Sequence, residues 1–68
     1  MAGFYVLRLD ESRNFQPLPG GIRSTEEAAV ITCQDYADRS GIRSIVRNSD
    51  GKTVYDSKVP RPNRKENP

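Results

Sequence analysis

The chain has 68 residues, of which 34% are hydrophobic and 29% are charged, and its formal net charge is +2. A chain of this length forms one small domain with a limited core, and none of its apolar runs approaches the length needed to cross a membrane. It has no histidine and one cysteine, which rules out an internal disulfide and leaves too few ligands for a conventional zinc site. We therefore expect neither a metal nor another cofactor. The first residues lead directly into strand-like sequence without a signal peptide, so we expect a cytoplasmic protein without a membrane anchor.

The excess positive charge lies near the C-terminus. Residues 58–68 contain more basic than acidic side chains, whereas residues 1–57 contain slightly more acidic than basic ones. Prolines and the absence of any periodic pattern predict a flexible tail over 58–68, after a single folded domain over 1–57. The tail is either a solubilising segment or a weak electrostatic arm for nucleic acid or an acidic partner. The tail side chains expected to make such contacts are Arg61, Arg64 and Lys65.

The first predicted element is a β-strand over residues 4–9, with the sequence FYVLRL. Aromatic and branched side chains favour a strand. Both faces of this strand are largely apolar, which is typical of a central strand in a sheet. Its two faces carry Tyr5, Leu7 and Leu9 on one side, and Phe4, Val6 and Arg8 on the other.

A second, shorter strand is predicted over residues 15–18, after a polar turn. Pro17 has no backbone N–H, so this strand should be short and should lie at an edge of the sheet. Pro19, Gly20 and Gly21 are predicted to end regular structure. The two glycines lack the spacing and the following Lys-Ser or Lys-Thr of a phosphate-binding loop, which favours a plain connection.

The stretch from Ser24 to Gly41 predicts a helix over about residues 25–40. Ser24 is the predicted N-cap, with Glu27 as its partner in a capping box, and Gly41 is predicted to end the helix in a left-handed conformation. Ile31 falls on the outer side, either as a lone exposed residue or as part of a partner surface. The inner stripe contains a cysteine that should be buried rather than reactive. This stripe consists of Ala29, Val30, Cys33, Tyr36 and Ala37.

The last two predicted strands, residues 42–47 and 52–57, flank the turn Asn-Ser-Asp-Gly at 48–51. This sequence is typical of a type I turn whose glycine is left-handed. The chain thus predicts a small two-layer ββαββ domain of the α+β class, in which one helix packs on one face of an antiparallel sheet.

The turn leaves two registers open for this hairpin. A three-residue loop with a bulge pairs Val46 with Val54 and Ile45 with Tyr55. A two-residue Asp-Gly loop would instead place Tyr55 opposite Val46. The first register is our prediction, and it places Ile45 and Tyr55 on the same face.

The order of elements and four short motifs resemble a family of uncharacterised bacterial proteins catalogued as domain of unknown function 2188. The motifs are FYVLRL in the first strand, STEEAA at the start of the helix, a glycine after the helix, and SIVRNSDGK in the hairpin, and together they cover about residues 4–57. The resemblance implies a small ββαββ fold and no established activity.

Catalysis is not expected. General acid–base chemistry needs positioned titratable groups, and without histidine the candidates are surface carboxylates such as Asp35 and Asp38. The protein is expected to be a non-enzymatic binding or regulatory module that contacts another protein, or a second copy of itself, through an exposed sheet face. A small regulator of a larger bacterial or phage assembly is one form of this function. The residues expected to bind the partner are Phe4, Val6, Arg8, Arg43, Ile45, Arg47 and Tyr55.

Two alternatives use the same sheet. A partner strand could add to one of its edges. The protein could also bind nucleic acid weakly, with Tyr5 or Tyr55 stacked on bases while Arg8, Arg43, Arg47 and the tail contact phosphates.

Overall fold

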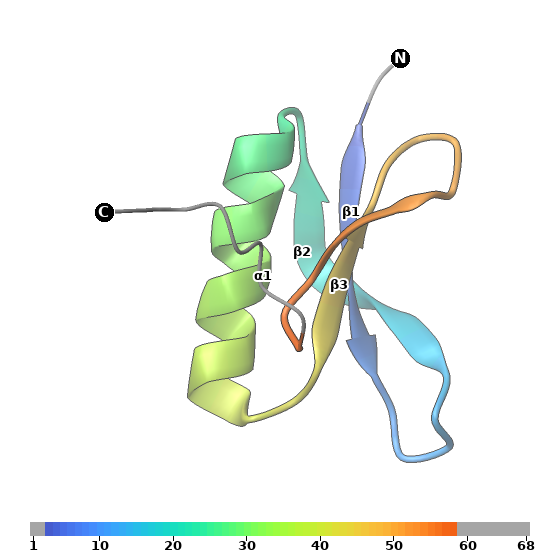
Figure 1. Ribbon diagram of the computed structural model, residues 1–68, viewed down its shortest axis with the longest axis vertical. Helices are drawn as coiled ribbons and strands as arrows, with labels where there is room; N and C mark the ends of the chain where they lie inside the picture. The colour runs from blue at the N-terminus through green and yellow to red at the C-terminus, as the bar shows by residue number, and fades with distance from the viewer. Residues whose placement is uncertain (1–2, 59–68) are drawn as a thin grey trace.

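A computed structural model describes residues 3–58 of the chain. The sheet is antiparallel, with the strand order β2-β1-β3-β4, and the helix packs on one of its faces (Figure 1). The predicted ββαββ fold is therefore confirmed, whereas the predicted tail contacts of Arg61, Arg64 and Lys65 lie outside the described residues. Within residues 3–58, no helix has the length and apolar character needed to cross a membrane. The elements are β1 (Phe4–Leu9), β2 (Phe15–Arg23), α1 (Glu26–Ser40), β3 (Ser44–Arg47) and β4 (Thr53–Asp56).

Strand β1 lies in the interior of the sheet, as its apolar faces predict. It pairs with β2 on one side and with β3 on the other. Val6 and Leu7 point to opposite faces, because successive side chains of a strand alternate. Both are buried, at 1% and 8% exposure, so each face of the sheet has apolar side chains to cover.

Helix α1 begins one residue later than predicted and ends where predicted. Thr25, rather than Ser24, is the N-cap, because it has the extended backbone and its Oγ1 accepts a hydrogen bond from the Ala28 N–H at 3.2 Å. The predicted capping box of Ser24 with Glu27 is therefore wrong. At the other end, Gly41 has a φ of 72° and its N–H donates to the Ala37 carbonyl at 2.8 Å, which is a left-handed helix end as predicted.

Strand β2 runs through the prolines and glycines that were predicted to end it. It does lie at an edge of the sheet, where a proline is tolerated because its missing N–H would face away from the neighbouring strand. The pairing with β1 changes from Leu7 opposite Pro17 to Tyr5 opposite Ile22, so β2 has extra residues at this irregularity. Gly21 lies at the close approach, since a Cβ there would stand 2.9 Å from the Leu18 carbonyl oxygen.

The β3–β4 hairpin has the predicted turn but a different register. The Gly51 N–H donates to the Asn48 carbonyl at 3.0 Å, and Gly51 has a φ of 83°. Arg47 pairs with Thr53 next to the turn, and the register then shifts, so that Tyr55 stands opposite Val46. The predicted pairs of Val46 with Val54 and of Ile45 with Tyr55 are therefore wrong, because a bulge at Val54 moves Tyr55 to the helix side of the sheet.

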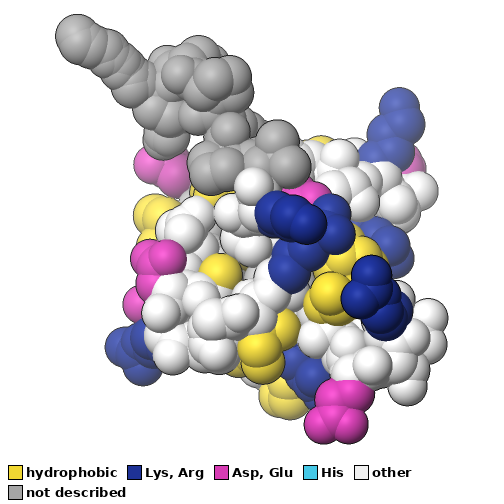
Figure 2. Space-filling model, turned by 60° about the horizontal axis from the view of Figure 1, so that its bottom comes forward, with side chains coloured by type: hydrophobic (Ala, Val, Ile, Leu, Met, Phe, Trp, Pro, Cys, Tyr) yellow, Lys and Arg dark blue, Asp and Glu magenta, His cyan; other side chains and the backbone are white. Residues whose placement is uncertain are grey.

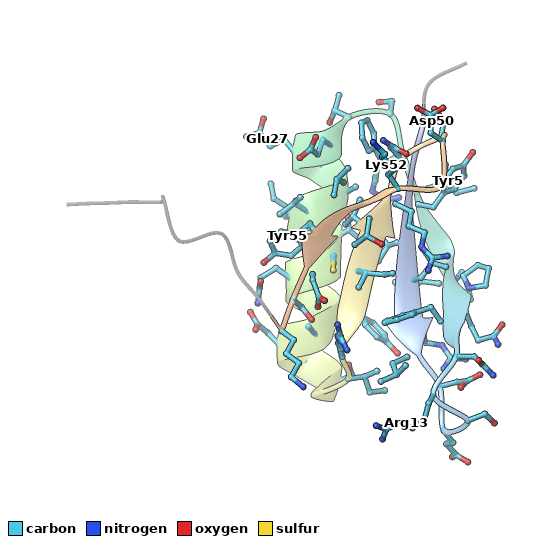
Figure 3. The ribbon with its side chains drawn as sticks, turned by 45° about the vertical axis from the view of Figure 1, so that its right-hand side comes forward. Tyr5, Arg13, Glu27, Asp50, Lys52 and Tyr55 are labelled. Carbon is cyan, nitrogen blue, oxygen red and sulfur yellow. The ribbon has the colours of Figure 1, made fainter. Side chains whose placement is uncertain are left out.

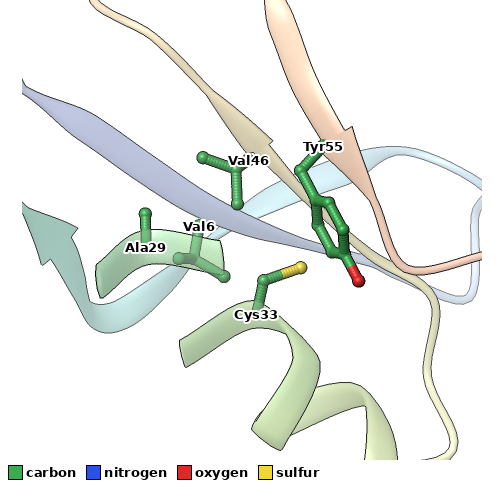
Figure 4. Close-up of a cluster of buried hydrophobic side chains, with 5 residues drawn as sticks. All are labelled: Val6, Ala29, Cys33, Val46 and Tyr55. Atoms are coloured by element: carbon green, nitrogen blue, oxygen red, sulfur yellow. The ribbon is translucent and has the colours of Figure 1, made fainter. Parts of the chain in front are cut away.

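The main core lies between the sheet and α1, and Figure 4 shows its buried side chains. Cys33 is fully buried beneath the ring of Tyr55, whose hydroxyl donates to Gln34 Oε1 on the same helix. The prediction that this cysteine is buried is therefore confirmed, and burial raises the pKa of its thiol to about 11. The buried members of this core are Val6, Ala29, Cys33, Val46 and Tyr55.

Candidate functional site

The sheet surface opposite α1 is called here the open face. Residues that stand opposite each other in antiparallel strands project to the same face, so the observed register defines its members. Tyr5 shares this face with Ile22, and Leu7 shares it with Pro17 and Ile45. The open face consists of Tyr5, Leu7, Leu9, Phe15, Pro17, Ile22, Arg43, Ile45, Arg47, Thr53 and Asp56.

The structure divides the predicted partner-binding residues between the two faces. Arg43, Ile45 and Arg47 lie on the open face, as predicted. Four others do not: Val6 and Tyr55 belong to the core under α1, Phe4 packs against that core, and Arg8 alternates with Leu7 and stands opposite Ser44 on the helix side. The prediction that all seven residues share an uncovered face is therefore wrong.

The centre of the open face is buried although no helix covers it. Leu7 and Ile45 are only 8% and 2% exposed. Phe15 and two arginines lie over this region: the Cζ atoms of Arg43 and Arg47 stand 5.6 and 5.9 Å from the centroid of the Phe15 ring. Arginine side chains cover apolar surface with their methylene groups and interact with aromatic rings through the guanidinium, so this cluster acts as a partial cover.

The charge of Arg43 is balanced within the domain. Its Nε and Nη2 donate to the two carboxylate oxygens of Asp56 at 3.1 and 2.5 Å, which is a bidentate pair. The hydrogen bonds from Arg43 lower the pKa of Asp56 below its usual value, and the same pairing raises the pKa of Arg43. Arg43 is therefore held in place and its charge is compensated.

Arg47 has no such compensation. Among the described residues the ion pairs are Arg39 with Asp35 and Arg43 with Asp56, and neither involves Arg47. Its Nε is buried, and no described group accepts a hydrogen bond from it. A buried donor without an acceptor lowers the stability of a protein by about 1–3 kcal/mol. An acceptor supplied by a binding partner would therefore stabilise this conformation of Arg47.

Next to Arg47 the open face is hollowed. The hollow has a volume of about 270 Å³, and it lies between the end of β1 that carries Tyr5 and the β3–β4 turn. Figure 3 shows Tyr5 beside this turn, on the side of the sheet away from Tyr55 and the helix. The lining side chains are Tyr5, Leu7, Pro17 and Arg47, with Asn48, Ser49 and Gly51 of the turn.

Two large side chains next to each other on the open face are exposed to solvent. Tyr5 is 41% exposed and Ile22, its partner across the β1–β2 pair, is 67% exposed. Figure 2, in which the lower end of the molecule in Figure 1 comes forward, shows Lys and Arg side chains next to hydrophobic ones on the surface. The alternation of β1 places Tyr5 on the strand face opposite to Val6, as predicted, but the neighbour Ile22 was missed because β2 was predicted to end at Leu18.

The described residues contain no group of three or more His, Cys, Asp or Glu side chains that could hold a metal ion. The carboxylates considered as catalytic candidates are engaged on the helix surface. Asp35 pairs with Arg39 at 3.3 Å, and Asp38 accepts a hydrogen bond from Gln34 at 2.9 Å. The open face is therefore the surface of this domain that combines exposed apolar side chains, an uncompensated charge and a hollow.

No family model matches the chain, and neither a curated protein nor a solved structure is significantly similar to it. The resemblance to domain of unknown function 2188 stays a prediction. The function is therefore argued from the geometry of the open face.

Proposed function

We propose that the protein is a small, non-enzymatic binding module that contacts another protein, or a second copy of itself, through the open face. The observation that supports this most directly is the pair Tyr5 and Ile22, which are exposed side by side on a surface that also carries Arg47. Aromatic, aliphatic and arginine side chains are the usual anchors of protein interfaces.

The support beneath this surface suits it for binding. Tyr5 lies on β1, which is hydrogen-bonded to a strand on each side, and the neighbouring Leu7 is buried. Anchors on paired strands lose little conformational freedom when a partner binds. We propose that the module acts in the cytoplasm, without catalysis and without a cofactor.

The test compares two exposed isoleucines on different surfaces. Ile22 on the open face and Ile31 on α1 are 67% and 64% exposed, so Ile22→Ser and Ile31→Ser remove equivalent apolar surface. Tagged wild-type protein and both variants are used to capture partners from the lysate of the host organism, with and without nuclease, and self-association is followed by analytical ultracentrifugation. We expect Ile22→Ser to reduce capture or self-association at least tenfold, whereas Ile31→Ser leaves it unchanged.

Equal effects of the two substitutions would contradict the proposal. The nuclease treatment tests the alternative that the protein binds nucleic acid. In this structure, two residues predicted to contact nucleic acid are not available for it. Tyr55 is buried under α1, and Arg43 is paired with Asp56. Material that disappears after nuclease treatment would favour nucleic acid, whereas a captured protein that survives it supports the open face as a protein-binding surface.

A further inference from the structure

We propose that the hollow beside Arg47 binds a short segment of a partner protein in which an aspartate or glutamate is flanked by apolar side chains. This inference rests on the proposed function and names the chemistry of the partner. Three observations support it: the uncompensated positive charge of Arg47, the apolar side chains that line the hollow, and the small area of the open face.

The charge favours a carboxylate. Arg43 and Arg47 both lie against Phe15, but only Arg43 has an acidic partner among the described residues. Arg47 lines the hollow, and its buried Nε has no acceptor among the described residues. A carboxylate is the planar acceptor that a guanidinium binds with two parallel hydrogen bonds. The pair of Arg43 with Asp56 shows this geometry on the same face.

The walls favour apolar neighbours on either side of that carboxylate. Tyr5, Leu7 and Pro17 line the hollow beside Arg47, and their side chains present aromatic and aliphatic surface. An ion pair formed there would be shielded from water, which strengthens it. A flanking leucine, methionine or aromatic side chain would supply that shielding from the side of the partner.

The small area of the open face favours a peptide segment over a second copy of the chain as the partner. Four strands spaced about 4.8 Å apart, with a rise of about 3.3 Å per residue over a six-residue strand, give a face of roughly 300–400 Å². A stable dimer buries about 800 Å² on each partner. A second copy would also bring its own Arg47 toward this one, and two uncompensated guanidinium groups repel each other.

A nucleic acid fits this surface less well. Residues 3–58 contain as many acidic as basic side chains, whereas a nucleic-acid strand presents a phosphate at every nucleotide and is usually met by several cations. Asp56 lies on the open face and Asp50 in the turn beside the hollow. A hollow with one arginine and apolar walls is better suited to bind one carboxylate than a strand of phosphates.

The test is a titration of ¹⁵N-labelled full-length protein with acetylated, amidated pentapeptides, followed by ¹H–¹⁵N correlation spectra. One peptide has glutamate between two leucines on each side, and the matched peptide has glutamine in its place. We expect the glutamate peptide to shift the amide signals of Tyr5, Arg47 and Gly51 selectively, and to bind at least tenfold more tightly than the glutamine peptide. Sodium phosphate at the same concentrations is expected to leave these signals unchanged.

Three variants assign the effect to Arg47. Arg47→Gln should abolish the difference between the two peptides, and Arg47→Lys, which retains the charge, should keep part of it. Arg39→Gln removes a cation from the surface of α1 and should change nothing; each spectrum also reports whether the variant is folded.

The proposal is overturned if the glutamine peptide binds equally well, if Arg39→Gln weakens binding as much as Arg47→Gln, or if neither peptide binds at millimolar concentration. Selective shifts with phosphate would overturn it in favour of a phosphate ligand. Because the Ile22 and Ile31 comparison does not depend on a carboxylate, the open face can remain the binding surface when this inference fails.

Discussion

The two faces of the sheet are covered in different ways. On the helix side, the side chains of Val6, Val46 and Tyr55 pack directly against Ala29 and Cys33 of α1. Every one of these five residues is at most 8% exposed. On this face, a helix of the same chain covers the buried side chains of the sheet.

On the open face, Leu7 and Ile45 are buried to a similar extent, but their cover is formed by Phe15, Arg43 and Arg47. This cover contains two charged side chains, and it leaves Tyr5 and Ile22 exposed at one end of the sheet. The difference shows that a sheet face without a helix need not be bare. Its partial cover leaves a defined region for a partner.

The largest effect is expected from removing the largest side chain of the helix-side core. Tyr55→Ala should lower the free energy of unfolding by about 3–5 kcal/mol, which is close to the whole stability of a domain this small. Tyr5→Ala, on the exposed side, should change it by less than about 1 kcal/mol. Urea denaturation followed by circular dichroism measures both, and similar losses would show that the faces do not differ in this way.

The second substitution tests the cover of the open face. Ile45→Ala should cost about 2–5 kcal/mol, as expected for a buried isoleucine. If Phe15 and the arginines did not shield Ile45 from water, the cost would instead resemble that of a surface residue, below about 0.5 kcal/mol. Thermal unfolding of the Ile45→Ala and Ile45→Val variants separates these outcomes, because only a buried site gives a graded loss.

A smaller effect is expected from the charge that holds the cover in place. Asp56→Asn removes the partner of Arg43 and should cost about 1 kcal/mol or less at pH 7, because the pair is partly exposed to solvent. The folded state lowers the pKa of Asp56 below its ordinary value of 3.8. The stabilisation is therefore present above about pH 4 and is lost as the pH falls through the lowered pKa.

The measurement for Asp56 is the stability of the wild type and of Asp56→Asn between pH 2 and pH 7. Their difference should be constant at neutral pH and should shrink below about pH 4. A difference that stays unchanged down to pH 2 would show that the ion pair is not its source.

The smallest perturbation is chemical labelling of Cys33 in the helix-side core, which needs no substitution. Its pKa is raised from 9.0 to about 11 by burial, so at pH 8 we expect its reaction with Ellman's reagent to be slow in the native state and fast in urea. The unfolded chain ionises this thiol first as the pH rises, so its contribution to stability is complete below about pH 9 and is lost progressively toward pH 11. Fast labelling of the native protein would show that the helix-side core opens readily.

The sequence was sufficient for the order of elements because each has a local signal. The apolar first strand, the glycine that ends the helix and the Asn-Ser-Asp-Gly turn all have the predicted roles. The errors arose where tertiary pairing overrides local preference. Strand β2 continues through Pro17, Pro19 and Gly20 because an edge strand needs hydrogen bonds on one side only.

The candidate site was less predictable than the fold. Phe4–Leu9 is apolar on both faces, so alternation alone does not say which face meets the helix, and Phe4 and Val6 were placed on the wrong side. The bulge at Val54 changes the face of Tyr55, and no residue in that strand indicates a bulge there. Arg43, Ile45 and Arg47 were placed correctly because they alternate next to a turn whose geometry was recognised.

The most direct test of the account is photo-cross-linking from the two surfaces of the native protein. Tyr5→p-benzoylphenylalanine places an aromatic photoreactive group on the open face, and Ile31→p-benzoylphenylalanine places it on the outer side of α1 at another exposed position. After irradiation in the host lysate, we expect a discrete covalent adduct from position 5, and none from position 31. Adducts from position 31 alone, or equally from both positions, would contradict the assignment of the open face as the binding surface.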